Sequence, residues 1–421
     1  MKKLNYDIVV IGGGPAGMAA ALEARKAGIE KILICERGSK LGGILEQCIH
    51  NGFGLQYFKE ELTGPEYATR FSDQVEASDI DVKVNTMVMD IQEDKKVIAV
   101  NGTDGLFEVE TKAVILAMGC RERTRESITI PGDRPSGVMT AGTAQRYVNI
   151  NGYLPGKEIV ILGSGDIGLI MARRMTFEGA NVKGVLELMP YSTGLVRNKV
   201  QCLDDFGIPL YLSHTVTKIH GKERLTGVSI AEVDENKNPI PETEIFVPCD
   251  TLLLSVGLVP ENELSKKVGI KLDPVTKGAV TDEKRRTSVD WIFACGNVLH
   301  VHDLVDNVTE ESELAGRAAA GYILGEYEER KNPIKVTPGE NIGYIVPQSI
   351  DFDDKAQKLI KLYMRVKNPK ENIRMVITDD KGEVLAQFKK DIVEPGSMVT
   401  LALPTVKLTD DTKEISVSVV E

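Results

Sequence analysis

The sequence is poor in aromatic residues and in closely spaced cysteines. Phe, Trp and Tyr make up 5% of the 421 residues, and the six cysteines, at positions 35, 48, 120, 202, 249 and 295, form no C-x-x-C motif. A disulfide framework needs cysteines that can pair, so this usage favours a reducing, cytoplasmic compartment. The cysteines other than Cys48 flank apolar segments and are expected in the core.

Long apolar runs are also missing, and the short basic patches that occur, such as Lys389-Lys390, are interpreted as solvated surface. No window of about 18 apolar residues occurs, which predicts no membrane span. The residues after Met1 are interrupted by Asp7 and lead directly into a glycine-rich motif, so we interpret them as a first strand and not as a signal peptide. A formal net charge of −11 argues against nucleic-acid binding, because phosphate contacts need clustered Lys and Arg.

The clearest motif occupies residues 7–17, an apolar run that ends at three glycines and continues with helical character. Gly12 permits a tight turn, Gly14 lets the backbone approach a pyrophosphate, and Gly17 allows the helix to pack closely on the strand. The helix N-terminus faces the phosphates. A second strand ends in Glu36, whose carboxylate can accept both hydroxyls of an adenosine ribose, so the motif predicts a dinucleotide site.

The same motif occurs a second time in residues 158–168. Glu187 follows Gly163 by 24 residues (187 − 163), the interval found in the first copy. Two copies at one spacing predict two dinucleotide sites. Glu187 pairs with a free 2′-hydroxyl and repels a 2′-phosphate, and residues 188–190 supply no arginine, so NAD is favoured over NADP.

The remaining segments extend this α/β pattern. Residues 111–119, 251–257 and 287–297 are predicted to be strands that end in small residues. A helix is predicted over residues 309–323, with Thr309 at its N-terminus. Beyond Pro333, short alternating segments between turns predict a small all-β module.

These motifs resemble those of the two-dinucleotide-binding-domain flavoproteins, the pyridine nucleotide-disulfide oxidoreductase superfamily, over about residues 5–330. The resemblance implies an α/β fold of the glutathione reductase type, with two Rossmann-like domains, the NAD-binding one inserted in the FAD-binding one. The implied domains are residues 1–120 with 285–332 for FAD, 121–284 for NAD, and 335–421 for the all-β C-terminal domain. By position, the implied FAD contacts are Gly12, Gly14, Pro15, Ala16, Gly17, Glu36, Arg37, Gly43, Val88, Ala117, Gly119, Gly296, Asn297 and Thr309, and the implied NAD contacts are Gly163, Gly165, Asp166, Ile167, Gly168, Glu187 and Gly257.

Two departures from that superfamily bear on mechanism. Its members usually place an Asp after the glycine at position 296, whereas this chain has Asn297, which forms hydrogen bonds without bringing a charge. The disulfide reductases carry a C-x-x-x-x-C pair near the flavin, whereas Gly42-Gly43 is followed here by the single Cys48. One thiol cannot close an intramolecular disulfide, so glutathione, lipoamide and thioredoxin reductase activities are not expected.

Residues 43–54 and 294–306 resemble a narrower group, FAD subunits found beside glycerol-3-phosphate dehydrogenase and related to subunits of opine oxidase and hydrogen cyanide synthase. This resemblance implies an FAD-dependent NADH oxidase or dehydrogenase that passes electrons to oxygen or to a redox partner protein. It also implies a hetero-oligomer with a glycerol-3-phosphate dehydrogenase-like flavoprotein. Two alternatives stay open: an NADH-dependent peroxide or disulfide reductase acting through Cys48, and a structural subunit that holds FAD without NADH chemistry.

Three local features have both a chemical and a simple interpretation. By analogy Cys48 and His50 lie near the flavin and are candidates for gating oxygen or a proton, but a packed thiol and a hydrogen-bonding imidazole are favoured. Thr309 is either a plain N-cap or a group that stabilises charge on the flavin pyrimidine edge. His300 and His302 lie on one face of an extended segment, but no cysteine or carboxylate cluster lies nearby at ligand spacing, so no metal is expected.

Overall fold

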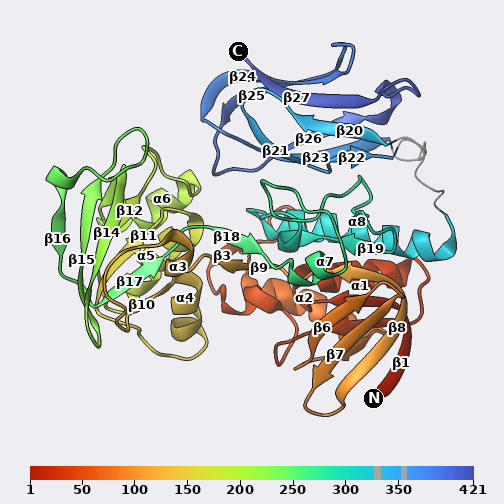
Figure 1. Ribbon diagram of the computed structural model, residues 1–421, viewed down its shortest axis with the longest axis horizontal. Helices are drawn as coiled ribbons and strands as arrows, with labels where there is room; N and C mark the ends of the chain where they lie inside the picture. Colours follow the sequence, from red (N-terminus) through yellow and green to blue (C-terminus); the bar gives the residue numbers. More distant parts are fainter. Residues whose placement is uncertain (327–332, 352–357) are drawn as a thin grey trace. The chain divides into compact units, whose positions relative to one another are not determined.

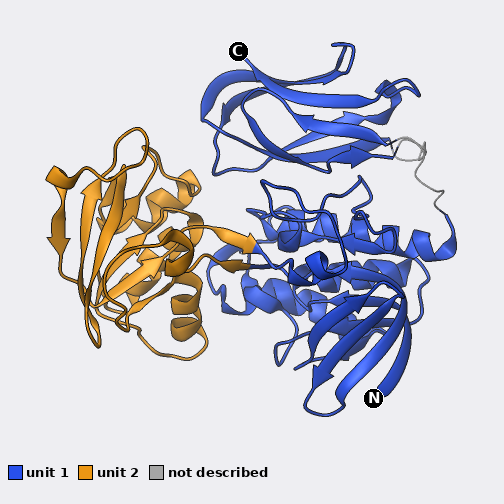
Figure 2. Ribbon diagram, viewed as in Figure 1, with its two compact units in different colours: residues 1–120, 260–421 blue, residues 121–259 orange. Residues whose placement is uncertain are grey.

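The computed structural model describes residues 1–326, 333–351 and 358–421. The chain divides into two compact units, Met1–Cys120 with Pro260–Glu421, and Arg121–Val259 (Figure 2). The second unit is therefore inserted in the first, which the chain leaves in strand β9 (Cys120–Glu122) and re-enters in β18 (Leu258–Pro260). This insertion of one α/β unit in another is the architecture that the resemblance to the superfamily implies.

The first unit is built on a seven-stranded sheet of order β5-β2-β1-β8-β7-β6, with β19 also paired to β8 (Figure 1). Strands β1, β2, β5, β8 and β19 pair in parallel, and β6, β7 and β8 form an antiparallel meander. The strands are β1 (Lys2–Ile11), β2 (Ile32–Cys35), β5 (Asp81–Lys83), β6 (Met87–Gln92), β7 (Lys96–Asn101), β8 (Gly105–Leu116) and β19 (Ile292–Ala294).

Alternate residues at the C-terminal end of β1 face two different cores, which explains why Ile8–Ile11 are all apolar and buried. Ile8 and Val10 pack with the helices α1 (Pro15–Lys26), α2 (Gly64–Glu76) and α8 (Val305–Leu324). Val9 and Ile11 pack on the other face, with residues of the meander. A parallel sheet that is covered on both faces requires such continuous apolar strands.

Shorter elements complete this part of the first unit. They are β3 (Asn51–Phe53), β4 (Leu62–Thr63), α7 (Glu263–Lys267) and the 3-10 turns η1 (Gly43–Gln47) and η4 (Gly296–Val298). The units divide at Val259 and Pro260, whereas the expected NAD-binding domain extends to residue 284. Residues 260–284 lie in the first unit because Val268, Ile270 and Ala279 are buried in the core on one face of its sheet.

The second unit repeats this layered plan. Its parallel sheet has the order β10-β17-β11-β12-β13, and a separate antiparallel sheet has the order β14-β15-β16. Helices pack on one face of the parallel sheet, and the antiparallel strands pack on the other. The elements are α3 (Arg125–Ile128), β10 (Val138–Thr140), α4 (Ala141–Asn149), β11 (Glu158–Leu162), α5 (Asp166–Phe177), β12 (Asn181–Glu187), α6 (Val196–Cys202), η2 (Asp204–Phe206), β13 (Leu210–Leu212), β14 (His214–Gly221), β15 (Leu225–Glu232), η3 (Pro241–Thr243), β16 (Ile245–Val247) and β17 (Thr251–Leu254).

The C-terminal module, residues 334–420, is all-β, as the sequence predicts beyond Pro333. It has two sheets, β22-β20-β27-β24-β25 and β21-β23-β26, which share one apolar core. Residues 327–332 and 352–357, which belong to the expected FAD-binding and C-terminal domains, lie outside the described residues. The elements are β20 (Ile334–Pro338), β21 (Ile342–Val346), β22 (Ser349–Ile350), β23 (Leu359–Val366), β24 (Lys370–Asp379), β25 (Val384–Val393), β26 (Val399–Pro404), η5 (Thr405–Lys407) and β27 (Glu414–Val420).

Candidate dinucleotide sites

The turn between β1 and α1 has the geometry of a phosphate cradle. Gly12 has φ +107°, and a Cβ there would lie 2.4 Å from the Ala117 carbonyl oxygen. A Cβ on Gly17 would lie 1.8 Å from the Gly12 oxygen, so helix and strand touch at this point. A Cβ on Gly14 would meet no protein atom nearer than the Gly43 Cα at 3.9 Å, so this backbone is open to a ligand. Two glycines are thus required by the fold, and the third leaves room in front of the helix N-terminus.

Glu36 closes the cradle from the end of β2. Its side chain is buried, and its two carboxylate oxygens accept from the backbone N–H groups of Gly13 at 2.6 Å and Gly38 at 2.5 Å. A carboxylate has about four lone-pair sites, so these two bonds orient the group and leave sites for ribose hydroxyls. Pro15 and Ala16 begin α1 directly behind the turn.

The second unit reproduces this geometry residue by residue. Gly163 has φ +102°, and a Cβ there would lie 2.0 Å from the Ser255 carbonyl oxygen. A Cβ on Gly168 would lie 2.4 Å from the Gly163 oxygen, whereas one on Gly165 would meet nothing nearer than the Ser255 Oγ at 3.7 Å. The internal repeat found in the sequence is therefore also a repeat of backbone conformation.

Glu187 corresponds to Glu36. Its Oε2 accepts from the Ser164 N–H at 3.0 Å and its Oε1 from the Met189 N–H at 2.9 Å, the same pattern two residues beyond the acid. The Ser164 and Thr193 hydroxyls add bonds of 2.6 and 3.1 Å to Oε2, so the acceptor site that Glu187 keeps for a ribose hydroxyl is on Oε1, which accepts a single bond. The carboxylate is buried, and the four donors hold it in one orientation.

The other expected NAD contacts have different surroundings. Asp166 begins α5, and its carboxylate accepts from the Leu195 N–H at 2.8 Å and the Asn198 side chain at 2.7 Å, which ties a following loop to the helix start. Ile167 packs on the helix-side core. Gly257 follows β17 with φ +101°, and a Cβ there would be 3.9 Å from the Arg123 side chain.

Three of the expected FAD contacts, Gly43, Gly296 and Ala117, lie against the first cradle, and a fourth, Gly119, follows Ala117 in the chain. A Cβ on Gly43 would lie 3.0 Å from the Gly14 Cα, and a Cβ on Gly296 would lie 2.8 Å from the Ala16 Cβ. Ala117 supplies the oxygen beside Gly12. Gly119, with φ +72°, has nothing within 4 Å of its Cβ position.

Three further expected contacts have partners within the first unit. The Asn297 side-chain oxygen accepts from the His302 N–H at 3.0 Å, and its amide donates to the Cys120 Sγ at 3.7 Å. Val88 is buried on β6, beside the meander. Arg37 is largely exposed and lies 4.0 Å from Glu261.

The prediction for Thr309 needs a correction. Helix α8 begins at Val305 with Leu304 as its N-cap, so Thr309 lies in the second turn and not at the helix N-terminus. Its backbone N–H is therefore past the first turn, whose N–H groups are open to charge on a ligand. The Thr309 side chain is fully buried, and its hydroxyl shares a 2.6 Å hydrogen bond with the Tyr67 hydroxyl.

Cys48 and His50 follow the turn η1. The Cys48 Sγ donates to the Ile44 carbonyl oxygen at 3.3 Å, and burial raises the pKa of this thiol to about 12. His50 lies against Phe53, with ring centroids 5.1 Å apart. A thiol with so high a pKa is protonated at neutral pH, whereas a cysteine nucleophile works as the thiolate.

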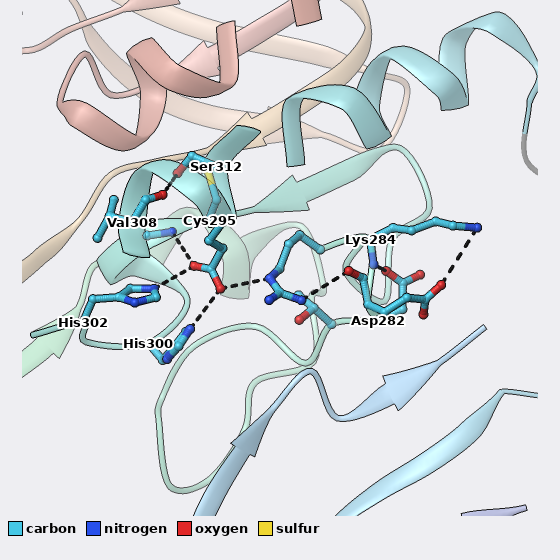
Figure 3. A network of polar contacts seen from close by, with 12 residues as sticks. Asp282, Lys284, Cys295, His300, His302, Val308 and Ser312 are labelled. Atoms are coloured by element: carbon cyan, nitrogen blue, oxygen red, sulfur yellow. Dashed lines mark hydrogen bonds and ion pairs between the residues drawn. The ribbon is translucent and has the colours of Figure 1, made fainter. Parts of the chain in front are cut away.

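A buried polar cluster was missed by sequence reasoning (Figure 3). Glu311 on α8 accepts from His300 and His302, the two histidines singled out in the sequence, and from Arg285. All four side chains are almost completely buried. The sequence contained one signal of a buried charge. Glu311 lies on the same helix face as Val308, Ser312 and Ala315, which are uncharged.

The arrangement fits two dinucleotides on the evidence of the protein alone. Each cradle leaves space beside a glycine, and each has a buried carboxylate, oriented by backbone N–H groups, at the end of its second strand. In the described residues, no helix is both long enough and apolar enough to cross a membrane. None of the six cysteines is in a disulfide.

Comparisons with known proteins agree with this geometry. The family model described as pyridine nucleotide-disulphide oxidoreductase matches residues 6–319. Hydrogen cyanide synthase subunit HcnB of Pseudomonas protegens is 28% identical over 346 residues, covering 76% of this chain and 71% of that protein. An opine oxidase subunit of Agrobacterium tumefaciens is 25% identical over 339 residues, covering 76% of this chain and 66% of that protein.

Among solved structures, thioredoxin reductase of T. acidophilum superposes with a TM-score of 0.62 at 23% identity. The match covers 76% of this chain and 99% of that one, which shows a shared two-domain flavoprotein fold. Because the family model spans both dinucleotide-binding units, the chain belongs to the pyridine nucleotide-disulphide oxidoreductase family, whose members use FAD and NAD(P)H.

Proposed function

We propose that this chain is an FAD-dependent NADH oxidase or dehydrogenase, and that it works within a glycerol-3-phosphate dehydrogenase-like complex. Electrons enter from NADH and leave to oxygen or to a partner redox protein. The observation that carries the proposal is the pair of matching cradles together with a cysteine that is not set up as a nucleophile. The relatives support an assembly, because one is named as a subunit of hydrogen cyanide synthase and the other as a subunit of opine oxidase.

The residues divide the work between the units. In the first unit, the open backbone at Gly14 receives the pyrophosphate of FAD, and Glu36 fixes its adenosine ribose. In the second unit, Gly165 and Glu187 do the same for NADH. When bound, FAD supplies the redox chemistry by accepting hydride and releasing electrons.

Glu187 also supports NADH as the donor. The carboxylate is buried and oriented by backbone N–H groups, and the three residues that follow it are Leu188, Met189 and Pro190. A 2′-phosphate would bring a second negative charge against this carboxylate without a basic residue next to it. We therefore propose NADH and not NADPH as the physiological donor.

A reductive and an oxidative half-reaction test the proposal. The purified full chain, loaded with FAD, is mixed with NADH without oxygen, and the visible flavin absorbance is followed. We expect bleaching without a partner protein, and recovery of the absorbance when oxygen or an artificial acceptor is added. Bound flavin that does not respond to NADH would instead identify a purely structural role.

Cys48→Ser separates the proposal from a cysteine-based reductase. Cys48 is half-buried, and its thiol donates to a carbonyl oxygen that a serine hydroxyl can also reach. We expect the variant to keep NADH oxidation within about twofold. A peroxide or disulfide reductase that cycles through this sulfur would lose turnover completely.

A further inference from the structure

The buried cluster around Glu311 lies between the expected flavin turn and the C-terminal module. The Glu311 Oε2 accepts from the Gly296 N–H at 2.9 Å and from the His302 Nε2 at 2.9 Å. The Oε1 accepts from the Arg285 Nε at 2.9 Å and from the His300 Nε2 at 3.0 Å. One carboxylate on α8 therefore holds four donors from the segment 285–302 (Figure 3).

A metal ion is the first alternative, because two histidines and a glutamate converge here. The hydrogen bonds argue against it. A carboxylate has about four lone-pair sites, and four donors already occupy them. The Arg285 guanidinium, whose side chain is 1% exposed, neutralises the charge of Glu311, so a divalent ion would add uncompensated positive charge in the interior.

The charge state of the cluster follows from its contacts. Burial alone would raise the pKa of Glu311, but His300, His302 and Arg285 together hold this pKa well below its usual value. Burial lowers the pKa of His300 to about 4, so that imidazole is neutral. A neutral imidazole that donates from Nε2 keeps its lone pair on Nδ1, and no partner for either Nδ1 is found in the described part of the chain. The negative Glu311 is thus the group that holds the imidazoles in place.

The same carboxylate fixes a turn that faces the first cradle. Gly296 has φ +71°, and its Cβ position is 2.8 Å from the Ala16 Cβ at the start of α1. The next residue, Asn297, accepts from the His302 N–H at 3.0 Å. His302 therefore binds the turn with its backbone N–H, and it binds the Glu311 carboxylate with its imidazole ring. Displacement of Glu311 would break its bonds to the Gly296 N–H and to the His302 ring.

The C-terminal module holds this turn from the other side. Strand β23 places the Tyr363 ring 5.6 Å from His300 and 5.7 Å from His302. Arg365 on the same strand pairs with Asp303, whose second oxygen accepts from the Met398 N–H at 2.6 Å. The module therefore shields the cluster from water and anchors the residue next to His302.

We propose that Glu311 is a positioning residue of the FAD site, which holds the Gly296–Asn297 turn in its binding conformation, and that β23 of the C-terminal module keeps this carboxylate and turn in place. The inference rests on FAD binding, which is a family property, and not on the proposed electron donor or acceptor. On this proposal, the affinity for FAD depends on the Glu311 carboxylate, which contacts the Gly296–Asn297 turn through the Gly296 N–H. It also gives the module a role within the chain.

Glu311→Gln is the direct test, because it keeps the side-chain shape and removes the charge. An amide presents one acceptor and one donor end, so either Gly296 or Arg285 faces a donor. We expect the dissociation constant for FAD to rise at least about tenfold and the visible circular dichroism of the bound flavin to change. Arg365→Ala is expected to weaken FAD binding in the same direction, by about threefold or more.

Asp351→Asn is the matched control. Asp351 is also buried and its carboxylate accepts from an arginine, Arg286, at 2.9 Å, but it follows β22 and pairs with a residue outside the cluster around Glu311. We expect it to lower thermal stability and to leave FAD affinity and the flavin spectrum unchanged, measured where all variants are folded. An affinity within twofold of wild type for Glu311→Gln, or an equal loss in Asp351→Asn, would overturn the positioning role. Unchanged affinity in Arg365→Ala would overturn the role of β23, and a stoichiometric metal that is lost in Glu311→Gln would overturn the whole assignment.

Discussion

The second glycine of each cradle, Gly14 or Gly165, gives the sharpest test of the site, because its Cβ position is open to a ligand and is not filled by the protein. Gly14 is the N-cap of α1, with φ −75° and ψ −175°, a conformation that alanine adopts without strain. An alanine Cβ there would meet no protein atom nearer than 3.9 Å. Gly14→Ala should therefore leave the apoprotein folded. Losing a favoured N-cap and stiffening the unfolded chain have opposite signs, so the net change in unfolding free energy should stay within about 1 kcal/mol.

The effect on the cofactor should be much larger. The added methyl group occupies the space in which a pyrophosphate approaches the backbone, and displacing one charge-assisted hydrogen bond costs about 1.5–3 kcal/mol. That cost corresponds to a rise in the FAD dissociation constant of roughly ten- to 150-fold. Titration of the apoprotein with FAD, combined with thermal melts of the apo and loaded forms, measures both quantities.

The repeated unit supplies the matched control. In Gly165→Ala, the Cβ would lie 3.7 Å from the Ser255 Oγ, and the change should weaken NADH binding while leaving FAD binding intact. Gly17→Ala, with a Cβ only 1.8 Å from the Gly12 oxygen, should instead unfold or fail to express. If Gly14→Ala bound FAD as wild type does, or melted as low as Gly17→Ala, our interpretation of the cradle would be refuted.

Three further predictions use other parts of the chain. Glu187→Gln should reduce the preference for NADH over NADPH, measured as the ratio of kcat/KM values, on the order of ten- to a hundredfold, because the amide no longer repels a 2′-phosphate; an unchanged ratio would contradict the assignment. Because the pKa of the Cys48 thiol is raised to about 12, its alkylation at pH 8 in the folded chain should be roughly a thousandfold slower than after unfolding and should rise tenfold per pH unit, as followed by mass spectrometry. Arg286→Ala should cost about 3–5 kcal/mol of unfolding free energy, since it leaves the buried Asp282 and Asp351 carboxylates without their cation, whereas loss of the exposed Lys370 should change the melt little.

Local patterns in the sequence predicted the cradles well. Gly12, Gly17 and Glu36 lie in one β-α-β segment and contact residues of that segment or next to it. Their spacing is fixed by the lengths of one strand and one helix. The second copy obeys the same constraint, so Gly163, Gly168 and Glu187 were found in the same way. Such features are predictable because one short stretch of chain contains nearly all the partners.

The start of α8 was predicted four residues too late. Asp306 and the residues after Leu304 carry no N-cap side chain that binds the first turn, so the usual signal of a helix start is missing. The helix packs closely on α1 through small residues such as Gly316, whose Cβ position lies 2.2 Å from the Ala20 oxygen. Thr309 consequently serves as a buried partner of Tyr67.

The sequence by itself determined the two strand-turn-helix dinucleotide motifs and the all-β character of the C-terminal segment, and its resemblance to a known superfamily implied that one domain is inserted in the other. Only the tertiary structure decided where the unit boundary falls, that the half-buried Cys48 has a raised pKa and is protonated, and that Glu311 joins His300, His302 and Arg285 in one cluster. The physical reason is the sequence distance between the residues involved. Hydrophobic periodicity and glycine spacing depend on residues that are neighbours in the sequence, whereas the burial and the pKa of a side chain depend on groups that folding brings together from distant parts of the chain.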